Sequence, residues 1–240
     1  MTEYLLYLES GPKHKKTMVH MLDLLGCIAQ GPTTEAALEA SPEAIRAFLG
    51  FLKKHGEAVD TQAPFTTRVA IHITEGTWLA NGDPTCGFAP DFEPLAAEDL
   101  ATYLRWLDWL QADLLELVQN LSFEKLQEEP ESGGRSIHHI LQHTADSHGV
   151  YLRYLVGKVD GLSEALKAVR DAPLEILPPT LTDLWHLTRT RLEALSEAER
   201  RQSVPHGQVT WTARRALRRM LEHAWEHRME ISTRLKNPIS

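Results

Sequence analysis

The segment Met220–Ile231 reads MLEHAWEHRMEI, and its periodicity predicts a helix from about Thr212 to Leu235. On such a helix His223 and His227 lie four residues apart, about one turn, so their imidazoles project from one face. Two imidazoles in this arrangement can share a metal ion. Because two ligands make a weak site, a third ligand has to come from another part of the chain.

Three earlier segments have the same helical texture. They lie near Ala96–Asn120, Ser136–Val156 and Thr182–Ser196. Breaks that contain proline or glycine separate the segments, for example 129–134 and 177–179. Four amphipathic helices joined by short to moderate connections predict an all-α four-helix bundle.

The second of these helices is rich in histidine. It contains SIHHILQHTADSHGVYL, in which His139 and His143 share a face and Asp146 follows three residues after His143. Bundle cores commonly hold metals between facing helices, so a second histidine-rich helix favours a metal site. The alternative is a set of half-buried or surface histidines.

These two helices carry a resemblance to a known family. The segments GRSIHHILQHTADSHGVYLRYLVG and RRALRRMLEHAWEHRMEI resemble the DinB/YfiT-like superfamily of metal-binding four-helix bundles, over about Leu95 to Leu235. Members hold a divalent metal with one histidine of the second helix and two of the last. The resemblance therefore implies that His143, His223 and His227 are the metal ligands.

The resemblance also implies a chemistry. Three imidazoles suit zinc, nickel or another late first-row ion and leave a position open for water or substrate. The superfamily includes thiol-dependent transferases and isomerases, and other members are classed as metal-dependent hydrolases. We therefore expect an enzyme that acts on a small molecule, with a low-molecular-weight thiol as a candidate cofactor and a homodimer as the assembly.

Several other side chains near the predicted ligands are candidates for lesser roles. Asp146 is a candidate proton acceptor, and His139 and His148 are candidates to orient a ligand or a bound water. Relatives often have a glutamate where this chain has His148. We interpret His148 as a residue that does not bind the metal. We interpret Glu226 as a surface residue. We expect His138, His186 and His206 to be ordinary histidines without a role at the metal site.

A run of arginines on the last helix has two readings. It could bind an anionic cofactor tail, but a solvated helix face paired with acids is favoured. The run comprises Arg214, Arg215, Arg218 and Arg219.

The N-terminal part has a different texture. Strands are predicted at Tyr4–Leu8, Thr17–Leu22 and Thr67–Thr74, with a helix at Thr34–Lys54 that starts at threonine caps and stops before Gly56. This β-β-α-β order predicts a small α+β domain. Its turn LGC (25–27) and the segment QGPTTEAA (30–37) resemble the HicB-like antitoxin fold. We carry over only that fold, and we interpret Cys27 as a packing residue.

The predicted organisation is a domain at residues 1–80, a linker at 81–94 and a bundle at 95–240. A net charge of −8 argues against a nucleic-acid partner. No apolar run reaches the ~18 residues of a membrane span, and no leader is evident, so a cytoplasmic protein is expected. A non-catalytic scaffold, whose N-terminal domain recognises a small molecule or a protein, is the alternative to the enzyme.

Overall fold

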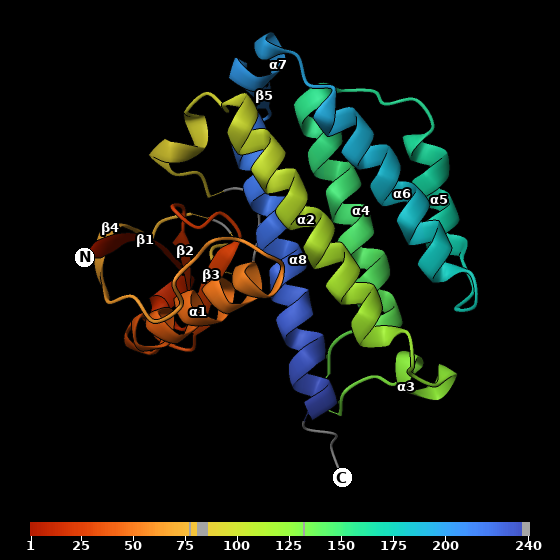
Figure 1. Cartoon of the computed structure of the whole chain (residues 1–240), viewed down its shortest axis with the longest axis horizontal. Coiled ribbons are helices and arrows are strands. Elements are labelled where there is room, and N and C mark those ends of the chain that lie inside the picture. The colour runs from red at the N-terminus through yellow and green to blue at the C-terminus, as the bar shows by residue number, and fades with distance from the viewer. Residues whose placement is uncertain (77, 81–85, 132, 237–240) are drawn as a thin grey trace.

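A computed structural model describes residues 1–76, 78–80, 86–131 and 133–236. An N-terminal sheet with one helix is followed by a helical region, as the sequence predicts. Figure 1 shows the sheet and its helix α1 on one side of the long helix α8, and helix α5 on the far side of the molecule.

The sheet has four strands and one crossover helix. Strands β1 and β2 are neighbours, β3 flanks β2, and β4 flanks β1, which gives the order β3-β2-β1-β4. The pairs β1–β2 and β2–β3 are antiparallel, whereas β4 runs parallel to β1 and is reached through α1. The bounds are Thr2–Ser10 for β1, Thr17–Met21 for β2, Cys27–Gly31 for β3, Thr34–Lys54 for α1 and Phe65–Ile73 for β4.

The order is therefore β-β-β-α-β, with one strand more than the sequence pattern indicated. The added strand is β3, CIAQG. Its residues Cys27, Ile28 and Ala29 are all buried, so the strand shows no alternation of apolar and polar residues. A five-residue segment without alternation gives no signal of the strand period.

Four long helices form the predicted bundle. Contacts join them in a ring, α2 to α6, α6 to α4, α4 to α8 and α8 to α2. The bounds are Ala97–Val118 for α2, Ile137–Val156 for α4, Leu177–Glu193 for α6 and Ala213–Lys236 for α8. The prediction for α6 was wrong at its start. Pro178 and Pro179 lie in the first turn of α6, where a missing N–H breaks no helical hydrogen bond, so they begin the helix instead of preceding it.

Shorter elements fill the connections of the bundle. Helix α5 packs outside it on α4 and α6, with Leu162, Leu166 and Val169 on its buried face. Helix α5 spans Leu162–Asp171, and the other elements outside the sheet are η2 (Ala89–Phe92), α3 (Phe123–Gln127), α7 (Glu197–Arg201), β5 (Val204–His206) and β6 (Val209–Trp211), while η1 (Pro12–His14) joins β1 to β2. Their brevity explains why the sequence pattern missed them.

The sheet packs directly on the bundle. The ring of Phe48 on α1 lies 5.0 Å from that of Trp225 on α8 and 6.0 Å from that of Trp106 on α2. Gly26 has a φ of 106°, and a Cβ there would lie 2.9 Å from the Cβ of Leu221, so the turn before β3 needs glycine twice over. These close contacts of Phe48 and Gly26 pack the sheet directly against α8.

The predicted linker is only partly described. Residues 81–85 lie outside the described residues, whereas Cys86, Phe88 and Asp91 are buried, so this part packs into the core. The predicted domain limits at 80 and 95 stay predictions. Among the described residues no helix has the length and apolar character needed to cross a membrane.

Candidate metal centre

Helix α8 supplies two of the three predicted ligands. It is capped by Thr212, whose hydroxyl accepts a hydrogen bond from the Arg215 N–H at 3.1 Å. His223 and His227 are each 6% exposed, because α2 and α4 pack along this part of α8. The side chains therefore face the bundle interior, as the four-residue spacing predicts.

Helix α4 supplies the third. The Ser136 hydroxyl accepts a hydrogen bond from the His139 N–H at 3.2 Å, and Gly157, with a φ of 74°, ends the helix. Between these ends, His143 is half-buried on the face turned toward α8.

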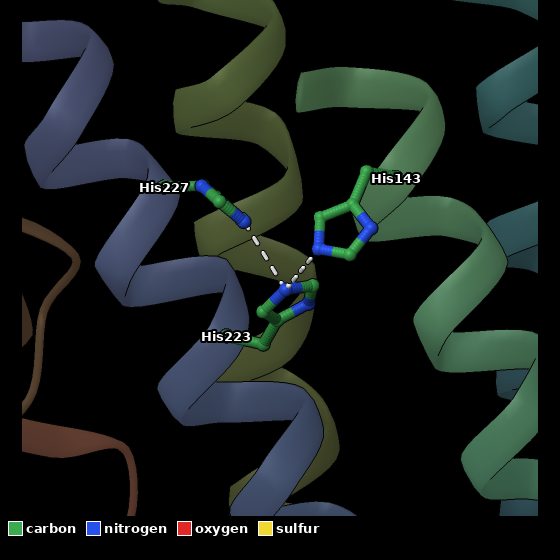
Figure 2. A group of neighbouring side chains, drawn as sticks. All are labelled: His143, His223 and His227. Carbon is green, nitrogen blue, oxygen red and sulfur yellow. Dashed lines mark hydrogen bonds between the residues drawn. The ribbon is translucent and has the colours of Figure 1, made fainter. Parts of the chain in front are cut away.

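The three imidazoles meet at their Nε2 atoms. His223 Nε2 lies 3.1 Å from His143 Nε2 and 3.1 Å from His227 Nε2, as Figure 2 shows. One potential ligand atom from each residue lies within 4.8 Å of the others. Nitrogens that bind zinc at 2.0–2.1 Å in a tetrahedron are about 3.3 Å apart, so the spacing around His223 fits such an ion.

A carboxylate orients one of the rings. His227 Nδ1 donates to Glu230 Oε2 at 2.8 Å, which leaves the lone pair on Nε2 facing the other histidines. A single hydrogen on His223 Nε2 can serve only one of its two neighbours. The arrangement thus presents nitrogen lone pairs to one another with too few protons between them, which a bound cation would resolve.

Burial keeps the imidazoles of His143 and His223 neutral. Desolvation, reinforced by the positive charge of Arg135, lowers the pKa of His143 to about 4. Desolvation and the neighbouring histidines lower the pKa of His223 well below its usual value. Neutral imidazoles are the form that binds metals, so both residues are ready to act as ligands at neutral pH.

Glu230 stays ionised beside them. Burial opposes its ionisation, but the hydrogen bond from His227 and the positive charges of Arg234 and Arg135 outweigh that effect and hold its pKa below the usual value. Sequence reasoning missed Glu230. Its position three residues after His227, on the same helical face, was the available signal.

His148 contacts the backbone of α8 and is not part of the group formed by His143, His223 and His227. It is fully buried, and its Nε2 donates to the Met220 carbonyl at 3.1 Å. Its Nδ1, like the Nδ1 of His223, is buried without a hydrogen-bond partner among the described residues. Its role as an orienting group stays a prediction.

The remaining candidates lie outside the cluster. Asp146 forms an ion pair with Arg170 at 3.0 Å, and the His139 side chain is exposed on α4. His186 and His206 are exposed, and His138 is partly buried. Glu226 is partly exposed and accepts a hydrogen bond from the Gln30 amide at 2.6 Å.

The arginines of α8 correct a prediction. Arg215, Arg218 and Arg219 are 1–2% exposed and do not form a solvated face. Arg218 pairs with Asp91 at 2.7 Å and with Glu222 at 3.0 Å, Arg219 pairs with Glu222 at 2.6 Å, and the His20 ring contacts Glu222 at 2.7 Å. These five residues, called here the buried ion network, join α8 to the sheet. The helical pattern could not predict these ion pairs, because the sheet and the segment around Asp91, both distant in sequence, cover this face of α8.

The helical region matches a known protein family. The model of the DinB superfamily matches residues 106–231, more than half of the chain. One solved structure, YfiT from Bacillus subtilis, described as a probable metal-dependent hydrolase with an unusual four-helix bundle topology, is similar at 21% identity and a TM-score of 0.47. The match covers 60% of this chain and 91% of YfiT.

Among curated proteins, none matches this sequence. The family match leaves the N-terminal sheet outside, so the HicB-like resemblance of that region stays a prediction. The match does include all three clustered histidines, His143 on α4 and His223 and His227 on α8. The chain belongs to the DinB superfamily.

Proposed function

We propose that this protein is a metal-dependent enzyme in which His143, His223 and His227 hold one divalent ion, zinc or nickel, through their Nε2 atoms. The observation that carries the proposal is the convergence of these atoms, 3.1 Å apart around His223. Three nitrogen ligands from two helices are a common basis for a catalytic site that keeps a position open.

The surrounding residues prepare the three ligands. Glu230 holds the Nδ1 hydrogen of His227 and so aims its Nε2 at the cluster. Arg234 pairs with the other oxygen of Glu230 and keeps this carboxylate in place. The partial exposure of His143 supports access to the cluster from the side of α4. An ion held by three imidazoles lowers the pKa of a water or a thiol at its open position and makes it a nucleophile.

The reaction class we propose is hydrolysis of a small molecule or transfer of a low-molecular-weight thiol to one. Both need the same thing from this chain, three neutral ligands and a free coordination position. Asp146 is not the base we favour, because its carboxylate pairs with Arg170.

Metal content tests the proposal. Untagged protein, purified without chelator, is measured by mass spectrometry beside a His223→Ala/His227→Ala double variant and a His186→Ala control on the exposed face of α6. We expect about one equivalent of zinc or nickel per chain in the wild type and the control, and none in the double variant.

Activity follows from the same samples. The loaded wild type is screened for hydrolysis and for thiol transfer, and the double variant should lose whichever activity is found. A wild type that stays free of metal after reloading with zinc and with nickel would overturn the enzyme proposal and leave a scaffold.

A further inference from the structure

A groove that the metal centre does not use lies between the two regions of the molecule. Its volume is about 640 Å³, and its walls come from β3, α1 and the C-terminal half of α8. Figure 1 shows α1 beside α8, the two helices whose side chains form most of the lining. Pockets of about 300–1,000 Å³ at the junction of two structural units are the usual size and place of small-molecule sites.

Small side chains on α1 create the space. Ala40, Ala44 and Ala47 recur at steps of four and three residues and so line one face of the helix. Trp225 and Met229 of α8 lie across from them. Met229 is 37% exposed, which is high for a large apolar side chain. The groove therefore offers an apolar surface at Met229 and along the alanine face of α1.

The charged groups of the groove are mainly acidic. Glu43 and Glu226 line it, and neither forms an ion pair within the described part of the chain. Glu226 is instead held by the Gln30 amide, which donates to it at 2.6 Å. A neutral amide fixes the position of a carboxylate without neutralising its charge.

The other two charges in the groove are already engaged. Glu230 accepts from His227 and pairs with Arg234, and the Arg234 guanidinium also donates to the Arg135 carbonyl. Arg234 is therefore occupied, and the net charge of the side chains that line the groove is negative. Glu230 also brings one end of the groove next to the histidine cluster.

We propose that this groove binds a small organic cation, a protonated amine carried on an apolar or aromatic body. The ammonium group pairs with Glu226, Glu43 adds negative charge to the same groove, and the body packs over Met229 and the alanine face of α1. Charge-assisted hydrogen bonds to a fixed carboxylate supply specificity, and the apolar walls supply contact area. This site goes beyond the proposed function and does not depend on a bound metal.

Matched probes test it by isothermal titration calorimetry on the full chain. The probes are 2-phenylethylamine, which is protonated at neutral pH, and 2-phenylethanol, which has nearly the same shape and no charge. We expect the amine to bind about tenfold more tightly than the alcohol, the ratio that one additional charge-assisted hydrogen bond produces.

Three variants locate the binding. Glu226→Gln should bring the affinity for the amine down to that for the alcohol while leaving the alcohol unchanged. Ala47→Leu, at an exposed position of the groove wall, should weaken both probes. Glu175→Gln, an exposed acid outside the groove, should change neither.

Three results would overturn the proposal, and the first two are equal affinity of the wild type for both probes and an amine affinity that Glu226→Gln leaves unchanged. Failure of the amine to bind a folded wild type at millimolar concentration would also overturn it and favour a protein partner on this surface. Metal content, measured on the same samples, reports on the proposed function independently.

Discussion

Helix α8 carries two polar clusters that differ in kind. Toward α4 it presents His223 and His227, whose Nε2 atoms converge with that of His143, with the carboxylate of Glu230 on the far side of the His227 ring. Toward the sheet it presents Arg218, Arg219 and Glu222, which pair with Asp91 and His20, and Glu9 on the other side of His20 completes the balance of charge in the core. A buried cluster whose charges pair with one another is explained by its structural role. Nitrogen lone pairs that converge with no cation between them instead indicate a binding site for one.

The largest effect should come from breaking the buried ion network. Arg218→Met leaves Asp91 and Glu222 as buried carboxylates without their main partner, and loss of one partner of a buried pair costs about 3–5 kcal/mol. Chemical denaturation should show this loss of unfolding free energy. A loss below about 1 kcal/mol would mean that the network contributes little to holding the sheet on α8.

A smaller effect is expected where the metal centre depends on a carboxylate. Glu230→Gln removes the charge that holds the His227 Nδ1 hydrogen, and loss of such a partner typically weakens metal binding about 10–100-fold. Competition with a chromogenic chelator measures the affinity. Unfolding free energy serves as the control and should change far less than in Arg218→Met.

The pH dependence separates the two clusters further. Burial opposes protonation of His20, but the charge and hydrogen bond of Glu222 outweigh it and raise the pKa of His20 above 6.5. A raised folded-state pKa contributes stability that is complete below pH 6.5 and is lost as the pH rises through the folded-state value.

The stability difference between wild type and His20→Gln should therefore be largest below pH 6.5 and should shrink at alkaline pH. Denaturation curves at a series of pH values measure it. A difference that grows with pH would contradict the sign of the His20 shift.

The smallest effect is expected for Asp146→Asn. Asp146 pairs with Arg170 in a partly exposed ion pair, and such pairs contribute about 0–1 kcal/mol. Metal affinity and metal content should equal those of the wild type. A variant that loses the metal would instead place Asp146 in the metal centre.

Local sequence patterns predicted much of this protein. Helix α1 begins at Thr34 and ends at Lys54, as its caps indicate, and the three histidines come together as their spacing and the family resemblance imply. Glu230 was within reach of the same helical reasoning. Strand β3 was not, because a short strand buried along most of its length lacks alternation.

What the sequence by itself determined is therefore local. It set which segments are helical, where most of them end, and which faces of α4 and α8 carry histidine, because caps and the 3.6-residue period act over a few turns.

The tertiary structure alone decided what covers each face. It turned the predicted solvated arginines into a buried network and left an acidic groove between α1 and α8. Burial and the pairing of charges depend on elements distant in sequence, such as Arg218 with Asp91 or Gln30 with Glu226, and no local period reports on a distant partner.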